Sequence, residues 1–111
     1  MDEPKERDYI FFKSGSDRQK VILSDILYAE GMKNWCRIHT PAGIITVKST
    51  MKQLLEKLGG EFMQVHKSYI ISIHKIEGVK ARKVRIAGNE IPVGRIYWGD
   101  FFRTIINKIK Q

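Results

Sequence analysis

Three short segments of the chain carry side chains that can present hydrogen-bond donors or positive charge to an anionic partner. Lysine and arginine bond to guanine acceptors, whereas asparagine, serine and the tryptophan ring nitrogen can bond to phosphate oxygens or bases. The sequence around each segment predicts a loop end beside a rigid sheet, which suits an exposed binding surface better than an enclosed substrate pocket. The segments are residues 31–35 with Lys33, Asn34 and Trp35, residues 66–68 with His66, Lys67 and Ser68, and residues 94–95 with Arg95.

Each of these residues alone has an ordinary structural interpretation. Lys33 can be a solvated loop charge and Trp35 an anchor on a sheet. Lys67 can protect a strand from aggregation, and Arg95 can begin a helix without any partner. The binding hypothesis therefore depends on the combination of the three segments.

The three histidines raise the question of catalysis or metal binding, because imidazole is a common general base and metal ligand. His39, His66 and His74 lack a paired metal-ligand spacing, and Cys36 lies on the opposite face of the expected strand from His39. The sequence also lacks a Gly-rich phosphate loop and a nucleophile elbow. We therefore predict a binding protein rather than an enzyme, with no metal or cofactor. His39 and His74 are expected on a sheet surface, and His66 is expected to bind either a phosphate or a structural hydrogen-bond partner.

Positive charge is concentrated in the part of the chain that holds these segments. The formal net charge is +8, but residues 1–30 hold five Lys/Arg against seven Asp/Glu, so residues 31–111 hold fifteen against five. A basic surface attracts phosphate backbones and releases their counterions, which is the general basis of nucleic-acid affinity. A solvated basic surface without a partner is the alternative that charge alone leaves open.

Hydrophobic periodicity predicts a mostly β domain with two helices. Strands are expected at 9–13, 20–23, 25–30, 35–40, 43–48, 75–80, 83–87 and 90–93, and the apolar run 62–76 is also β-prone. Thr50 and Gln53 form a capping-box pattern that predicts a helix from Met51 to Leu58, ended by two glycines. A second helix is expected over 96–109. Its broad apolar stripe, which favours core packing or a dimer face, comprises Trp98, Phe101, Phe102, Ile105, Ile106 and Ile109.

The length of 111 residues fits one domain with its own core. Residues 1–8 are charged and lack a hydrophobic period, so a linker or frayed leader is expected there, followed by a single domain at 9–110. Cys36 has no possible disulfide partner within the chain, which favours a small, partly buried apolar residue in a reducing compartment. With no apolar run long enough to cross a bilayer and no secretory signal pattern, a cytoplasmic location is expected.

Several blocks, in this order and spacing, resemble one known family, the LytTR DNA-binding domain. The most specific are His66-Lys-Ser-Tyr-Ile70 and Ile91-Pro-Val-Gly-Arg-Ile-Tyr97. Leu23-Ser-Asp-Ile-Leu-Tyr-Ala-Glu-Gly-Met-Lys-Asn-Trp35 and the helix end Leu54-Leu-Glu-Lys-Leu58 add to them. The similarity runs from about Tyr9 to Lys110, nearly the whole chain.

The resemblance implies an elongated, mostly antiparallel β domain with short helices at its edge. Such domains insert loop side chains into successive major grooves of duplex DNA. The family's base-reading positions fall on Trp35, Lys67 and Arg95. Trp35 stands where some members have histidine, and Lys67 where some have asparagine, so the bases read there stay open. The neighbouring backbone or secondary contacts implied by the resemblance are Lys33, Asn34, His66 and Ser68.

The resemblance also implies partners. LytTR domains occupy the C-terminus of LytR/AlgR/AgrA-type bacterial response regulators in two-component phosphorelay systems, behind a phosphoacceptor receiver domain. The 111 residues contain no such domain, so we expect either an excised domain, which we favour, or a stand-alone regulator. Phosphorylation of a full-length regulator is expected to produce a homodimer that places two such domains on paired promoter repeats.

Two alternatives remain open from the sequence. The first is a protein-interaction module whose C-terminal helix presents Trp98, Phe101 or Phe102 to a partner while the basic charge only maintains solubility. The second is an RNA-binding domain that stacks bases on Trp35 and Tyr97.

Overall fold

The computed structural model describes residues 8–14 and 16–109, apart from the side chains of Ser14, Lys108 and Ile109. The expected leader at 1–8, except Asp8, lies outside the described residues. The same holds for Gly15, which lies between the first two predicted strands, and for Lys110 at the predicted end of the domain. No described helix is long and apolar enough to span a membrane.

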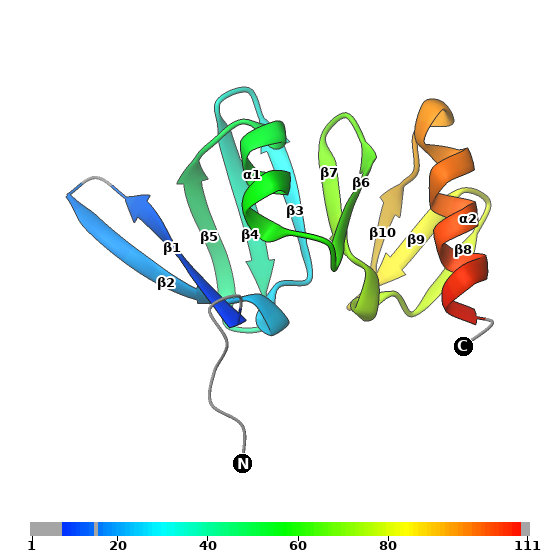
Figure 1. Cartoon of the computed structure of the whole chain (residues 1–111), viewed down its shortest axis with the longest axis horizontal. Coiled ribbons are helices and arrows are strands. Elements are labelled where there is room, and N and C mark those ends of the chain that lie inside the picture. Colours follow the sequence, from blue (N-terminus) through cyan, green and yellow to red (C-terminus); the bar gives the residue numbers. More distant parts are fainter. Residues whose placement is uncertain (1–7, 15, 110–111) are drawn as a thin grey trace, which may run out of the picture.

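Antiparallel strands form most of this structure (Figure 1). The chain forms a two-stranded sheet β1-β2, a five-stranded sheet in the order β5-β4-β3-β7-β6 and a three-stranded sheet in the order β10-β9-β8. The strands are β1 Tyr9–Ser14, β2 Asp17–Ile22, β3 Tyr28–Met32, β4 Trp35–Thr40, β5 Gly43–Lys48, β6 Phe62–His66, β7 Tyr69–Ser72, β8 Gly78–Lys80, β9 Lys83–Ile86 and β10 Asn89–Pro92.

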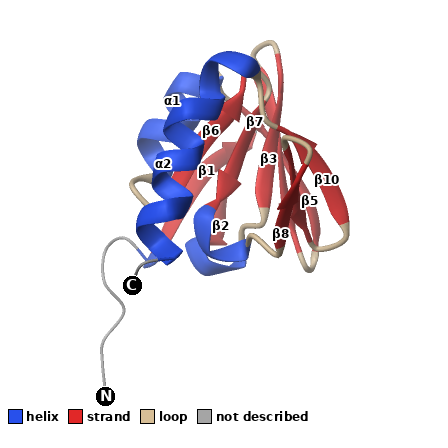
Figure 2. Ribbon diagram, turned by 90° about the vertical axis from the view of Figure 1, so that its right-hand side faces the viewer, coloured by secondary structure: helices blue, strands red, loops and turns tan. Residues whose placement is uncertain are grey.

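The two α-helices, α1 Met51–Leu58 and α2 Trp98–Ile109, lie on the same side of the sheets, as Figure 2 shows. Each helix covers its own core. Leu54 and Leu58 of α1 are buried against the five-stranded sheet in one cluster of apolar side chains, and Phe101 of α2 is buried in a second cluster with residues of β6, β7, β9 and β10. The predicted mainly β fold with short helices is confirmed.

Strand β4 shows how the sequence pattern selects the buried face. Cys36 and Ile38 are fully buried, while Trp35 and Arg37 point to the exposed face, as a period of two requires. Cys36 is thus more deeply buried than expected. Burial raises the pKa of its thiol, and its sulfur lies 3.4 Å from the Ser49 carbonyl oxygen, so the neutral thiol is favoured.

The capping box at α1 is confirmed. The Thr50 hydroxyl accepts a hydrogen bond from the Gln53 amide, and the Gln53 side chain accepts one from the Thr50 amide, both at 3.1 Å. These bonds satisfy amide donors that the first helical turn leaves without partners. Gly59 ends the helix with a φ of 90°, a conformation that favours glycine.

Two predicted strand starts were wrong for the same reason. A one-turn 3₁₀-helix at Leu23–Asp25 precedes β3, which begins at Tyr28 rather than at residue 25. A second at Ile73–Lys75 precedes β8, which begins at Gly78 rather than at residue 75. In both cases the residue after the turn donates its amide back three residues, which interrupts the strand ladder.

The other differences concern element ends. The run 62–76 is a hairpin, β6 with β7, followed by the second 3₁₀-helix, so Lys67 and Ser68 lie in a turn between strands. The C-terminal helix is preceded by a 3₁₀ turn at Arg95–Tyr97 and becomes α-helical at Trp98. Pro92 ends β10, which is an edge strand, the position in a sheet that tolerates proline.

The apolar stripe of α2 is only partly core. Phe101 is 1% exposed, whereas Phe102 is 52% exposed.

We expect Phe101→Ala to lower the free energy of unfolding by about 3–5 kcal/mol, because it empties a packed site. Phe102→Ala, on the same helix, should change the free energy of unfolding by no more than about 0.5–1 kcal/mol. Urea titrations of the two variants check this, and equal losses would contradict the assigned orientation of the helix.

Candidate nucleic-acid interface

The first loop, residues 31–35, is a tight turn between β3 and β4. Met32 pairs with Trp35, so Lys33 and Asn34 form the tip. Lys33 has a φ of 59°, a left-handed conformation that costs a residue with a side chain of order 1 kcal/mol. The Asn34 carbonyl accepts a hydrogen bond from the Ser49 amide at 2.8 Å, which holds the tip against the end of β5. The side chains of Lys33 and Asn34 are exposed, and Trp35 is 47% exposed.

The second loop, residues 66–68, is the turn between β6 and β7. His66 pairs with Tyr69, so Lys67 and Ser68 form the tip, with Lys67 exposed. The ring nitrogen Nδ1 of His66 accepts a hydrogen bond from the Ser68 amide at 3.0 Å, and its carbonyl accepts one from the Gln64 side chain at 3.1 Å. His66 therefore has the structural hydrogen bond that the sequence left open. Its contact with a phosphate stays a prediction.

A β-bulge in β6 joins the second loop to the third, residues 94–95. The pairing of β6 with β7 passes from Gln64 to His66, so Val65 has no partner in the ladder. The Val65 carbonyl instead accepts a hydrogen bond from the Gly94 amide at 2.7 Å. Arg95 follows directly and is exposed at the start of the 3₁₀ turn before α2.

A further backbone hydrogen bond joins the first loop to the second. The Gly31 amide donates to the Ser68 carbonyl at 2.8 Å. Consequently all three loops are connected through main-chain atoms, and in Figure 1 the β3–β4 turn, the β6–β7 turn and the segment after β10 lie along the same upper edge of the molecule. We call these three loops the loop edge. The structure thus brings together all three predicted segments, with the tips of Lys33, Lys67 and Arg95 exposed.

The structure adds residues that the sequence did not indicate. The Val93 amide donates to the Arg82 carbonyl at 2.9 Å, so the β8–β9 turn is bonded to the strand end beside the third loop. Arg82 is exposed there, with a φ of 57°. Two large apolar side chains are also exposed within or beside the loops, Met32 at 43% and Ile96 at 84%. The predicted strands at 75–80 and 83–87 left residues 81–82 as their connection, but nothing in the sequence indicated that this turn bonds to the end of β10.

The other two histidines, His39 and His74, lie in different environments. His39 lies on the sheet, as expected, but its ring is stacked on Tyr28 and its Nε2 atom is buried without a hydrogen bond among the described residues. Glu30 lies 3.8 Å from that nitrogen. Burial lowers the pKa of His39, and the Glu30 carboxylate only partly opposes this effect. The prediction for His74 was wrong, because it lies in the second 3₁₀-helix, where it bonds Glu61.

No group of three or more metal-ligating side chains occurs within residues 8–14 and 16–109. The loop edge presents the cationic, amide and hydroxyl donors of its exposed side chains.

Comparison with known proteins identifies the family. The LytTr DNA-binding domain family matches residues 17–106, and the chain belongs to this family. A solved structure with a TM-score of 0.71 is the LytTr DNA-binding domain of a protein described as a methyl-accepting/DNA response regulator from Bacillus cereus. It is 18% identical, and the match covers 89% of this chain and 96% of that one. The comparison with curated proteins found no match.

The hydrogen bond between Gly94 and Val65 can be tested by removing its donor. Gly94 has a φ of −67°, which proline accepts, but proline has no amide hydrogen. We expect Gly94→Pro to lower the free energy of unfolding by about 1–3 kcal/mol, because the buried Val65 carbonyl loses its partner.

Gly94→Ala is the control, since it keeps the amide. Its Cβ would lie 3.1 Å from the Tyr97 ring, so a small shift of that ring is needed. Denaturant unfolding of both variants gives the comparison. A Gly94→Pro protein as stable as Gly94→Ala would show that this bond does not hold the third loop.

His39 predicts a pH dependence of stability. Because its folded pKa lies below the ordinary value of 6.5, the unfolded chain takes up protons first as the pH falls. Stability should therefore decline as the pH falls through and below about 6.5, the ordinary pKa of histidine. His39→Gln should flatten this decline in thermal melts, whereas His74→Gln, which alters an exposed ring, should not. An unchanged pH profile in His39→Gln would contradict the assignment.

Proposed function

We propose that this domain binds double-stranded DNA sequence-specifically through the loop edge. The observation that carries the proposal is the main-chain coupling of the three loops, which presents exposed donors from three separate segments on one rigid edge. Membership of the LytTr DNA-binding domain family supports the same partner. The net charge of +10 over residues 31–111 favours a polyanion.

Trp35, Lys67 and Arg95 are assigned to base contacts, one from each loop. A lysine or arginine can bond to the guanine O6 and N7 acceptors in the major groove, and a tryptophan can donate its ring N–H or contact a thymine methyl. Each residue follows or lies within a turn whose backbone is hydrogen-bonded to a strand. A rigid scaffold limits the conformational entropy that ordering these side chains costs on binding.

We assign contacts with phosphates, or other secondary contacts, to Lys33, Asn34, His66 and Ser68. Such contacts position the protein on the duplex but carry little sequence information. Met32 and Ile96, which are exposed next to the base-contacting residues, are suited to thymine methyl groups.

The dimensions of the domain fit contact with successive major grooves. Its principal extents are 42 × 40 × 24 Å. One helical turn of B-DNA is about 34 Å, so an edge of this domain can face two major grooves on one side of the duplex. This arrangement differs from insertion of one recognition helix into one groove, because strand ends rather than a helix carry the donors.

The biological setting that we propose is transcription regulation by a response regulator. The domain would serve as the C-terminal effector behind a receiver domain, and two domains would occupy paired promoter repeats as a homodimer. Once the first domain is bound, the second binds as an intramolecular event at a high effective concentration.

Arg95→Ala should weaken binding to a selected duplex by about 1–3 kcal/mol and relax preference at one base position. Arg18→Ala is the charge-matched control, because Arg18 is exposed on β2 outside the three loops. Its effect should be small and equal for all sequences. The sites are first selected from a random duplex library, and both variants are then titrated in mobility-shift assays. Unchanged affinity and base preference in Arg95→Ala would refute the site.

Two further measurements separate the alternative functions. Duplex binding must weaken steeply with added salt, whereas an apolar contact through α2 should not. Unlabelled single-stranded DNA or RNA can also be added as a competitor for the bound duplex. If it competes as well as unlabelled duplex does, the alternative in which bases stack on Trp35 and Tyr97 is favoured.

A further inference from the structure

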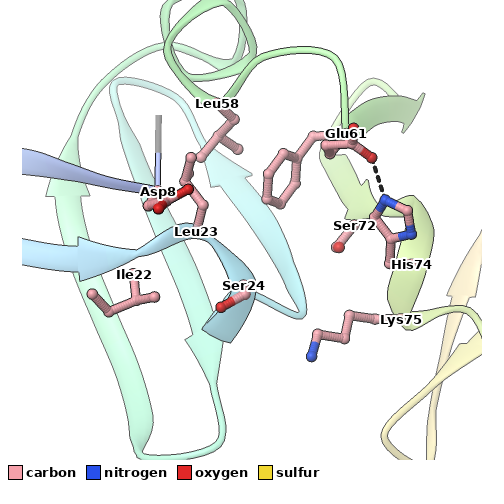
Figure 3. Close-up of a pocket in the computed structure, with 10 residues that line it drawn as sticks. Asp8, Ile22, Leu23, Ser24, Leu58, Glu61, Ser72, His74 and Lys75 are labelled. Atoms are coloured by element: carbon pink, nitrogen blue, oxygen red, sulfur yellow. Dashed lines mark hydrogen bonds and ion pairs between the residues drawn. The ribbon is translucent and has the colours of Figure 1, made fainter. Parts of the chain in front are cut away.

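A cleft of about 700 Å³ is lined by residues of the first and second 3₁₀-helices, which lie at the lower edge of the molecule in Figure 1, away from the loop edge. It is bounded by the end of α1, the first and second 3₁₀-helices and the end of β7 (Figure 3). Its volume is within the range of small-molecule sites, roughly 300–1,000 Å³. The lining residues are Asp8, Ile22, Leu23, Ser24, Leu58, Glu61, Phe62, Ser72, His74 and Lys75.

The walls of the cleft combine an apolar surface with the hydroxyl of one nearly buried residue, Ser72. Leu58 and Phe62 belong to the first core and present their edges to the cleft. Ser72 is only 4% exposed, and its side chain points into the cleft in Figure 3. The hydroxyl has no hydrogen bond to any other described residue, and its oxygen is not among the fully buried side-chain atoms, so it is accessible to a molecule in the cleft.

A single water molecule would satisfy that hydroxyl but would not fill the space. One water occupies about 30 Å³ of liquid volume, far less than the cleft provides. The apolar part of the wall gains nothing from water, because apolar surface is stabilised by contact with other apolar groups. The lining therefore suits an occupant with both an apolar body and a polar end.

The charges around the cleft determine the sign of that polar end. Lys75 extends from the second 3₁₀-helix toward the cleft and has no ion-pair partner within the described residues. The Glu61 carboxylate is already bonded to the His74 ring, and Asp8 lies on the opposite side of the cleft from Lys75 in Figure 3. Ser24 also lines the cleft but is exposed, so the ammonium of Lys75 and the hydroxyl of the nearly buried Ser72 are the donors best placed for an anionic end.

We infer that the cleft binds a small amphipathic carboxylate, such as a medium-chain fatty acid. The carboxylate accepts hydrogen bonds from the Ser72 hydroxyl and the Lys75 ammonium, and charge assistance makes such bonds stronger than neutral ones. The hydrocarbon chain lies against Leu58, Leu23 and Phe62. Because the cleft and the loop edge are on opposite sides of the domain, this ligand and DNA can bind at the same time.

The test uses the whole chain and octanoate as the probe, below its micelle-forming concentrations. Isothermal titration should show saturable binding at one site, and amide signals of residues 72–75 and of the end of α1 should shift in NMR spectra. Octanol and octylamine, which share the chain but lack the carboxylate, should bind at least about tenfold more weakly, since a charge-assisted pair is lost.

Two variants and a control locate the site. Lys75→Gln should weaken octanoate binding at least about tenfold, and Ser72→Ala should weaken it several-fold. Lys13→Gln, which removes an exposed lysine of β1 outside the cleft, should leave it unchanged. Unaltered affinity of Lys75→Gln for duplex DNA shows that this variant is folded and that its effect is confined to the cleft.

Any one of the following results would overturn the inference. The first is the absence of saturable octanoate binding to the wild-type chain. The second is equal binding of octanoate and octanol, or an affinity that Lys75→Gln does not change. The last is a set of NMR shifts at Ile76, Val79 and Ile105, which line a neighbouring cleft of about 480 Å³ that shares His74, with no shift at the end of α1.

Discussion

The arrangement of the loop edge depends on two main-chain hydrogen bonds, from Gly31 to Ser68 and from Gly94 to Val65. The second exists because a β-bulge leaves the Val65 carbonyl without a partner in its own sheet. Val65 is fully buried, so this carbonyl has no access to water as a substitute. The bulge therefore connects the five-stranded sheet to the segment that carries Arg95. The bond from Gly31 to Ser68 continues the pairing of β3 with β7, so the first two loops belong to one sheet, and the bond from Gly94 to Val65 adds the third loop to them.

This construction explains how a mostly β protein can present a DNA-binding surface without a recognition helix. Strands fix the base of each turn, and short turns leave little backbone freedom at the tips. The left-handed conformation of Lys33 is the kind of local strain that persists where surrounding structure enforces it. The helices contribute indirectly, since α1 and α2 each cover one of the two cores that hold the sheets in place. The opposite edge contains the first and second 3₁₀-helices, and the carboxylate site that we infer at Ser72 and Lys75 lies there.

Much of this structure could be predicted from the sequence, and the parts that could not share a physical cause. Alternation in 35–40 gave the buried face of β4, and the Thr50 and Gln53 pattern gave the start of α1, because both depend on local spacing. The three 3₁₀ turns at Leu23–Asp25, Ile73–Lys75 and Arg95–Tyr97 were missed, since a single hydrogen-bonded turn has no periodicity. The bulge at Val65 and its bond to Gly94 join residues far apart in the chain, so only tertiary structure reveals them. The positions of the candidate residues in turns were therefore predictable, whereas the connections between their loops were not; their contacts with DNA stay a prediction.

The most direct measurement is an NMR titration of the whole chain with a selected DNA duplex, followed at each backbone amide. The account predicts that the largest shifts occur together at residues 31–35, 66–68 and 94–95, with the same affinity at all three loops because they form one coupled edge. Shifts concentrated on α2 or around Ser72 and Lys75, with the three loops unaffected, would contradict it.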